Sequence, residues 1–160
     1  MKILVDADSC PKDARDLALR RAEKLGIQAV FAANRAIPGL NGAIMEICSL
    51  EANSADDRIV ELAEPGDLVI CRDIPLAKRL VDKNISVIDD RGRVFNSDNI
   101  NEFLSMRNFL VGLAENGLDI ERKNTYGKKE LKNFADSLDR VLSILSRNGT
   151  IPRGTGSGSA

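Results

Sequence analysis

The chain has 160 residues, of which 43% are apolar, with 23 basic and 24 acidic side chains. This length and apolar content predict one compact domain. The near balance of charge argues against a strongly basic nucleic-acid-binding protein and against an acidic tail protein. The lack of histidine in the sequence excludes Ser-His-Asp triads, Cys-His dyads and histidine-ligated zinc sites. The remaining chemistry belongs to carboxylates, with or without a hard cation, or to Cys, Lys, Ser and Arg.

The cysteines and the first residues of the chain indicate a cytoplasmic protein. Cys10, Cys48 and Cys71 are odd in number and far apart, which suits a reducing compartment better than a disulfide framework. The first residues lead directly into a short apolar run that ends at Asp6, unlike a signal peptide. No run approaches the roughly 18 apolar residues that a membrane helix needs. We therefore expect a cytoplasmic protein without a membrane segment.

Short apolar and β-branched runs alternate with amphipathic helical segments along the chain. The runs predict strands, and the alternation predicts a mostly parallel sheet with right-handed crossovers. We expect a three-layer α/β/α fold in which residues 1–147 form a single domain, followed by a disordered Gly/Ser-rich tail over residues 148–160. The predicted strands are residues 3–5, 28–33, 44–50, 68–71 and 85–88.

The helices are predicted from apolar spacing and from residues that favour helix ends. Pro11 suits the first turn of the first helix, and Gly26 ends it. Ser54 with Asp57 three residues later has the form of a capping box. The fourth helix is amphipathic, and apolar side chains such as Phe109 are available for burial. The predicted helices are residues 11–25, 54–63, 75–81, 97–115 and 130–146.

Aspartates follow the predicted strands at the points where the strands end. Ligands of open parallel sheets bind at the carboxyl ends of strands, because loops and helix N-termini converge there. If these strands are neighbours in the sheet, we expect their carboxylates to face a common crevice, which two aspartates in the first turn of a helix could also approach. The set comprises Asp6, Asp8, Asp73, Asp89 and Asp90, with Asp56 and Asp57 on the helix.

Each aspartate alone also has a structural explanation. Asp73 is suited to cap the helix that follows it, and Asp56 and Asp57 are suited to complement a helix dipole. The pair Asp6 and Asp8 favours a binding site, since two carboxylates at an apolar strand end repel each other unless a cation or hydrogen-bond donors compensate. A set of oxygen ligands without His or Cys selects Mg²⁺ or Mn²⁺ rather than zinc.

Several motifs, in the same order, resemble the bacterial YaiI/YqxD family over about residues 1–145. The motifs are Asp6-Ala7-Asp8-Ser9-Cys10-Pro11, Ala55-Asp56-Asp57, Gly66-Asp67-Leu68-Val69-Ile70, Asp73-Ile74-Pro75-Leu76-Ala77, Asp90-Arg91-Gly92, Met106-Arg107 and Leu138-Asp139-Arg140. That family is largely uncharacterised, and its fold is considered similar to the PIN domain, a metal-dependent nuclease architecture. The resemblance implies an acidic nuclease centre of Asp6, Asp57 and Asp73, with Asp8, Asp56 and Asp90 as further candidates.

The residues and the resemblance together predict a Mg²⁺- or Mn²⁺-dependent phosphodiester hydrolase that acts on single-stranded RNA or DNA. Asp6, Asp57 and Asp73 are the predicted metal ligands, with Asp90 as a further ligand. Asp8 or Asp90 is predicted to position water. Arg91 is predicted to neutralise charge, and the other cations that offer phosphate contacts, unless they are solvated surface charges, are Lys12, Arg35 and Arg72.

Other interpretations stay open at this point. In a haloacid-dehalogenase-like phosphatase, Asp6 would attack the phosphate and Asp8 would protonate the leaving group, although Cys10 and Asn34 fit that pattern imperfectly. Cys10 at a helix N-terminus could act as a nucleophile, but a structural thiol is the better interpretation. A non-catalytic metal- or RNA-binding module would use the cations around Tyr126 in residues 122–129.

Overall fold

The protein is built around one six-stranded sheet. A computed structural model describes residues 1–51, 53–118 and 125–148. The strand order is β3-β2-β1-β4-β5-β6, with β1 in the interior of the sheet and β6 as the one antiparallel strand among the described residues. The strands are β1 Lys2–Asp6, β2 Gln28–Ala33, β3 Ile44–Ile47, β4 Leu68–Ile70, β5 Ser86–Ile88 and β6 Val94–Phe95.

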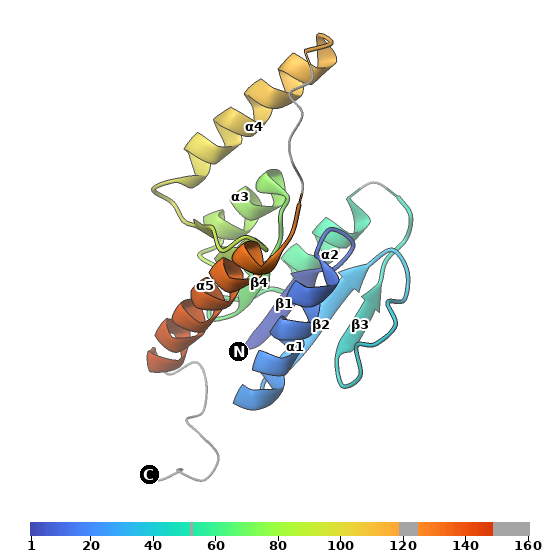
Figure 1. Cartoon of the computed structure of the whole chain (residues 1–160), viewed down its shortest axis with the longest axis vertical. Helices are drawn as coiled ribbons and strands as arrows, with labels where there is room; N and C mark the ends of the chain where they lie inside the picture. Colours follow the sequence, from blue (N-terminus) through green and yellow to red (C-terminus); the bar gives the residue numbers. More distant parts are fainter. Residues whose placement is uncertain (52, 119–124, 149–160) are drawn as a thin grey trace.

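Helices cover both faces of the sheet and confirm the predicted three-layer α/β/α fold. Helices α1 (Lys12–Leu25) and α5 (Lys128–Arg147) lie on one face, and α2 (Ser54–Leu62) and α3 (Ile74–Asp82) lie on the other (Figure 1). Two buried apolar clusters follow this division, one containing side chains of α1 and α5 and one containing side chains of α2 and α3. The interior strands β1 and β4 are therefore buried on both sides, whereas the edge strand β3 is partly exposed.

The strand register brings distant residues to one edge of the sheet. Val5 of β1 pairs with Phe31 of β2 on one side and with Ile70 of β4 on the other. Because these strands are parallel, the residues that follow each of them emerge at the same edge. Asp6 at the end of β1 therefore lies beside Cys71, the residue after β4.

Two details of the sheet differ from the sequence prediction. The third strand ends at Ile47 instead of continuing to residue 50. Strand β6, which the sequence did not indicate, has only two residues and pairs antiparallel with β5 through a tight turn at residues 89–93. A strand this short carries no alternating pattern, so it depends on its neighbour rather than on its own sequence.

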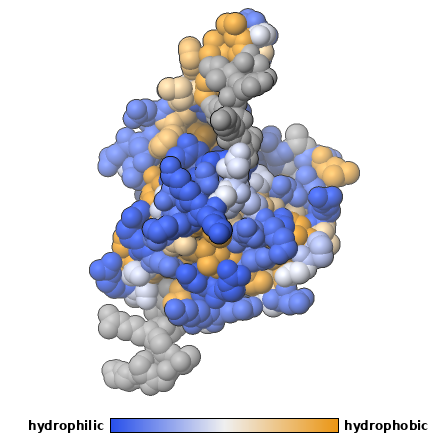
Figure 2. Space-filling view, in the orientation of Figure 1, coloured by the Kyte–Doolittle hydropathy of each residue, from blue (hydrophilic) through white to orange (hydrophobic). Residues whose placement is uncertain are grey.

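Helix α4 (Ile100–Glu115) corrects the prediction that its apolar side chains are buried. Ile100 is buried, and Phe103 packs edge-to-face on Phe95 with ring centroids 5.2 Å apart. Beyond this first turn the helix projects from the body, and Met106 and Phe109 are 56% and 60% exposed (Figures 1 and 2). The sequence pattern predicted the helix correctly, but it does not state what packs against the apolar side chains.

The predicted capping box at the start of α2 is also wrong. The residue that precedes the helix is Asn53, in a left-handed conformation with φ of 65°, and its side chain forms no capping hydrogen bond. Ser54 Oγ instead accepts a hydrogen bond from the backbone N–H of Ser49, and Asp57 pairs with Arg79.

The described helix α5 begins two residues before the predicted helix and ends at Arg147. Asn148, the first residue of the predicted tail, is the C-cap of α5. The rest of the tail, residues 149–160, lies outside the described residues.

None of the described helices combines the length and the apolar composition that crossing a membrane would demand. The longest of them, α5, carries charged residues along its whole length and packs one apolar side against the sheet.

Gly92 fixes the distance between α5 and the turn that joins β5 to β6. Its φ is +88°, and a Cβ at this position would overlap the backbone carbonyl of Asn133 on α5. Ser137 Oγ, one turn further along the helix, donates a 2.6 Å hydrogen bond to the Gly92 carbonyl. The turn and the helix therefore meet backbone to backbone at a place that only glycine fits.

We expect Gly92→Ala to lower the free energy of unfolding by about 2 kcal/mol or more, because it adds both backbone strain and a steric clash. Gly112→Ala is the matched control, since a Cβ at this position in α4 would meet nothing within 4 Å. That helical substitution should be neutral or stabilise by about 0.5–1 kcal/mol. Urea unfolding of both variants checks this, and equal stabilities would contradict the proposed close contact.

Candidate functional site

Asp6 is a buried carboxylate at the end of the interior strand β1. The residue is 8% exposed, and its Oδ2 accepts a 3.3 Å hydrogen bond from Ser9 Oγ. Burial, together with the negative charges of Asp56, Asp73 and Asp8 and against the lowering effect of the Ser9 hydroxyl, raises the pKa of Asp6 to about 6. The surroundings of Asp6 disfavour its ionised form. Ionisable groups with shifted pKa values are typical of functional sites.

Asp56 and Asp73 complete a cluster of carboxylates around Asp6. Burial raises the pKa of Asp56, and the charge of Asp73 adds to this while Arg79 opposes it. Asp73 precedes α3 and caps it, because its Oδ1 accepts a 3.0 Å hydrogen bond from the Leu76 N–H. The capping role considered for Asp73 is therefore real, and the same side chain still contributes charge to the cluster.

The structure places Asp57 differently from the sequence prediction. It is exposed and accepts a 2.9 Å hydrogen bond from Arg79 Nη1, and the carboxylate of α2 that raises the pKa of Asp6 is Asp56. Helical spacing carries this signal, because Asp56 lies three positions before the buried Ile59 and so shares its face. Asp8 is exposed, and its Oδ2 accepts a 2.9 Å hydrogen bond from the Asn34 N–H.

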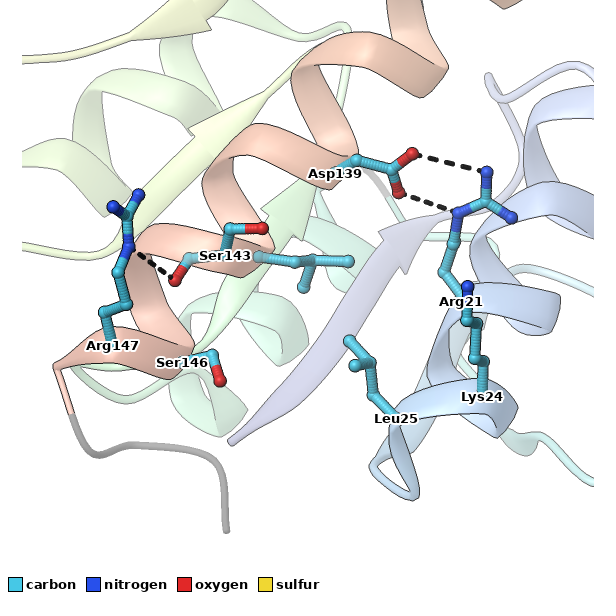
Figure 3. Close-up of a pocket in the computed structure, with 8 residues that line it drawn as sticks. Arg21, Lys24, Leu25, Asp139, Ser143, Ser146 and Arg147 are labelled. Atoms are coloured by element: carbon cyan, nitrogen blue, oxygen red, sulfur yellow. Dashed lines mark hydrogen bonds and ion pairs between the residues drawn. The ribbon is translucent and has the colours of Figure 1, made fainter. Parts of the chain in front are cut away.

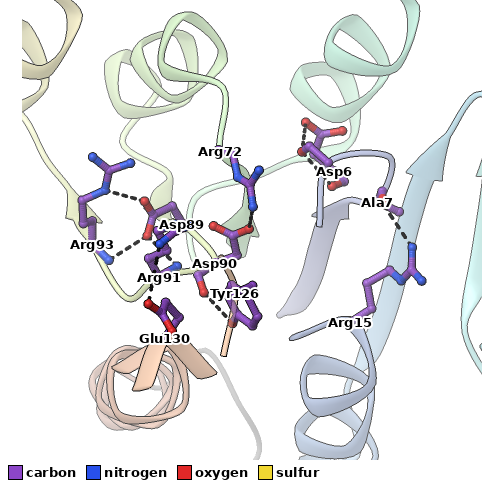
Figure 4. A network of polar contacts seen from close by, with 11 residues as sticks. Asp6, Ala7, Arg15, Arg72, Asp89, Asp90, Arg91, Arg93, Tyr126 and Glu130 are labelled. Carbon is purple, nitrogen blue, oxygen red and sulfur yellow. Dashed lines mark hydrogen bonds and ion pairs between the residues drawn. The ribbon is translucent and has the colours of Figure 1, made fainter. Parts of the chain in front are cut away.

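The turn after β5 holds two further buried carboxylates (Figure 4). Asp89 is fully buried and accepts hydrogen bonds from the backbone N–H groups of Arg91 and Arg93 and from Arg93 Nε. Asp90 is 1% exposed, and Arg72 donates a hydrogen bond to its Oδ2. Asp89 is thus fully engaged in holding the turn. Asp90 alone of the two lines the crevice.

Arg91, which the sequence offered as the cation of the site, faces a different partner. Its guanidinium lies 3.9 Å from a carboxylate oxygen of Glu130 at the start of α5 (Figure 4). Arg72, by contrast, lines the same small hollow as Asp6. The sequence placed both arginines after strands and did not separate them. The residues around the hollow are Asp6, Ser9, Cys10, Ile70, Cys71, Arg72 and Asp90.

Cys10 is present in this hollow as a thiol. Burial raises its pKa to about 12, and the charge of Asp90 adds to this, while Arg15 and Arg72 oppose it. A thiol with this pKa holds almost no thiolate at neutral pH, so it is a weak nucleophile. The geometry favours the structural interpretation of Cys10 that the sequence suggested.

The carboxylates do not form a closed metal cage. Across residues 1–51, 53–118 and 125–148, no three acidic or cysteine side chains lie close enough together to hold a metal ion. This arrangement does not fit an ion that needs three or four protein ligands. It does fit Mg²⁺, which keeps several water molecules and usually binds through one or two carboxylates together with substrate phosphates.

A second depression lies between the C-terminal ends of α1 and α5, away from the carboxylates (Figure 3). Arg21 and Asp139 form an ion pair across it, with two hydrogen bonds of 2.7 and 3.3 Å. Lys24 and Arg147 lie near the last turns of the two helices, where cations stabilise the exposed carbonyl groups. These contacts explain the depression as a helix–helix contact.

The raised pKa of Asp6 leads to a prediction on stability. In the folded protein Asp6 binds its proton more tightly than in the unfolded chain, so its stabilising contribution is present below about pH 4 and is lost as pH rises through about 6. Asp6→Asn keeps the shape of the side chain without the charge. In metal-free buffer the variant should exceed the wild type by about 2 kcal/mol at pH 8.

Urea unfolding between pH 4 and 8 measures this difference, with Asp16→Asn as the control. Asp16 is a partly exposed carboxylate that pairs with Lys12 on the surface of α1. The difference between Asp6→Asn and the wild type should shrink toward pH 4. A difference that is constant across this range would show that Asp6 is not destabilised by its ionisation.

Comparisons with known proteins give this arrangement a family. The sequence model of the uncharacterised YaiI/YqxD family matches residues 4–144. A UPF0178 protein of Treponema denticola is 50% identical over 143 residues, covering 89% of this chain and 92% of the relative. Another, of Ectopseudomonas mendocina, is 41% identical over 149 residues, covering 92% of this chain and 100% of the relative. No solved structure gives a significant match. The chain therefore belongs to the YaiI/YqxD family.

Proposed function

We propose that this protein is a Mg²⁺- or Mn²⁺-dependent phosphodiester hydrolase that cleaves RNA or DNA at the crevice where β1 and β4 end. The observation that carries the proposal is the burial of Asp6 beside the charges of Asp56 and Asp73, which raises its pKa to about 6. Asp6 is buried, Asp56 is half-buried and Asp73 is exposed, and ionising a buried carboxylate beside like charges is costly unless a cation compensates them. A divalent ion satisfies this requirement directly.

The proposed ligands follow from the placement of the carboxylates. Asp6 ends β1 and Asp73 follows the adjacent strand β4, and Asp56 is the carboxylate of α2 whose charge acts on Asp6. Asp57 is held by Arg79, so it would have to leave that partner to bind an ion. The bound ion would polarise the phosphoryl group and lower the pKa of a water molecule.

The remaining residues of the crevice orient the reactants. Asp8 is exposed and anchored by the Asn34 N–H, so it is available to accept a proton from water or to orient it. Asp90 is buried and lines a hollow without room for a water molecule, so its part in the proposed site is to hold the guanidinium of Arg72. The similarity of the family to the PIN domain, a nuclease architecture, supports the choice of substrate as an analogy of fold.

Cleavage of labelled single-stranded RNA and DNA in the presence of Mn²⁺ tests this function. We expect cleavage that stops when EDTA is added, and a loss of about a hundredfold or more in Asp6→Asn and Asp73→Asn, since each removes a charged ligand. Asp16→Asn on α1 should cleave at the wild-type rate.

Two results would contradict the proposal: no cleavage of any of these substrates, or cleavage that Asp6→Asn leaves unchanged. Mn²⁺-dependent release of phosphate from a phosphomonoester, with an acid-stable phosphoryl group trapped on Asp6, would instead favour the haloacid-dehalogenase-like alternative. Binding of RNA that survives both Asp6→Asn and chelation would favour a non-catalytic module.

A further inference from the structure

Arg72 lies at the boundary between the buried end of the sheet and solvent. It directly follows Cys71 at the end of β4, and 39% of its side chain is exposed, compared with 2% of the Asp90 side chain. One guanidinium nitrogen, Nη2, donates to Oδ2 of Asp90. The guanidinium is therefore fixed from the buried side, while part of it remains accessible.

The hollow beside Arg72 contains polar atoms that the fold leaves without partners. Oδ1 of Asp90 and Nε of Arg72 are buried and form no hydrogen bond to any described residue. Arg72 and Asp90 line the hollow together with Asp6 (Figure 4). Buried polar atoms without partners are uncommon in folded proteins. The hollow has no room for a water molecule, so a ligand can reach Arg72 only at the exposed part of its side chain.

The other arginines around the crevice are engaged elsewhere. Arg79 pairs with the exposed Asp57 at 2.9 Å, and Arg91 faces Glu130 on the side of α5. Neither of them lines the hollow that contains Asp6. Among the described residues, Arg72 is thus the cation that lines the hollow containing Asp6.

We propose that Arg72, held in place by Asp90, binds a non-bridging phosphate oxygen of the nucleic-acid substrate at the Asp6 crevice. This inference rests on the function proposed above and specifies how that site recognises its substrate. A guanidinium presents several N–H donors in one plane, so a side chain that uses one nitrogen on Asp90 keeps others for a phosphate oxygen. Because Asp90 already fixes the side chain, little conformational freedom is lost when the phosphate binds.

The neighbouring carboxylates determine how binding is best measured. Asp6, Asp56 and Asp73 repel a phosphate when no cation is present, and Asp6→Asn removes the most buried of these charges. The variant also removes a proposed metal ligand, so binding is separated from cleavage. Asp6→Asn is therefore the parent protein for the test, at low salt and with EDTA present, because phosphate contacts weaken as the salt concentration rises.

The experiment measures the fluorescence anisotropy of a labelled single-stranded RNA, and in parallel DNA, titrated with the parent protein and its variants. Arg72→Gln should weaken binding by about tenfold or more, which corresponds to the loss of a charge-assisted hydrogen bond. Arg72→Lys, which keeps the charge but not the fork, should lie between the two. An otherwise identical oligonucleotide with neutral methylphosphonate linkages should show little difference between Arg and Gln at position 72.

Two controls keep the result independent of folding and of general charge. Arg72→Gln leaves the buried Asp90 without its cation, so the double variant Arg72→Gln/Asp90→Asn restores neutrality and should bind as weakly as the single variant. Arg21→Gln removes the same charge from another arginine–aspartate pair, between α1 and α5, and should bind within about twofold of the parent.

Several outcomes would overturn the inference. They are the absence of binding by the Asp6→Asn parent, an affinity of the folded double variant equal to that of the parent, and a loss of affinity in Arg21→Gln equal to that in Arg72→Gln. This result is separable from the test of the function. Weakened binding in Arg72→Gln together with no cleavage by the wild-type protein would sustain the phosphate contact and reject the hydrolase. Cleavage by Arg72→Gln with unchanged KM would support the hydrolase and reject the phosphate contact.

Discussion

The burial of Asp6 at the end of the interior strand is the constraint on which the proposed site depends. Strand β1 pairs with β2 and β4 on its two sides, so the residue that ends it is covered by the neighbouring elements. Ser9 supplies the one side-chain hydrogen bond that lowers the pKa of Asp6, while burial and three carboxylates raise it. An ionised carboxylate at this buried position lowers the stability of the fold. Natural proteins keep such destabilising residues mainly at functional sites.

The wall of the crevice is built by parts of the chain that are far apart in sequence. Asp90 is placed by the turn after β5, and that turn is held on two sides. Ser137 of α5 donates to the Gly92 carbonyl, and the Tyr126 hydroxyl donates a 2.6 Å hydrogen bond to the Asp90 carbonyl. The last helix therefore does more than cover the sheet, because it fixes the backbone that presents Asp90 to Arg72 and to the hollow containing Asp6.

The sequence predicted the architecture well because its signals are local. Short β-branched runs that end in aspartate, alternating with amphipathic helices, led to the parallel sheet, and each described parallel strand lies within or close to its predicted range. The exposed part of α4 could not be predicted, since an apolar side chain such as Phe109 does not specify its partner. The two-residue strand β6 lacks any period of its own.

The sequence indicated the location of the candidate site better than it indicated the residues that form it. The sequence indicated that Asp6 and Asp73 would share an edge, because parallel strands end at the same edge of a sheet, and the pairing of β1 with β4 brings them together there. It named Asp57 and Arg91 ahead of Asp56 and Arg72, because each choice depends on which way a side chain points and on a partner elsewhere in the chain. Arg79 and Glu130, which engage Asp57 and Arg91, decide these two cases.

Anomalous diffraction from crystals soaked in Mn²⁺ tests whether the carboxylates around Asp6 bind a divalent cation. We expect one strong anomalous peak within coordination distance of Asp6, with Asp73 or Asp56 as a second ligand and water molecules completing the shell. No peak at this edge of the sheet, with Asp73 still capping α3 and Asp6 bound to Ser9 alone, would contradict this expectation.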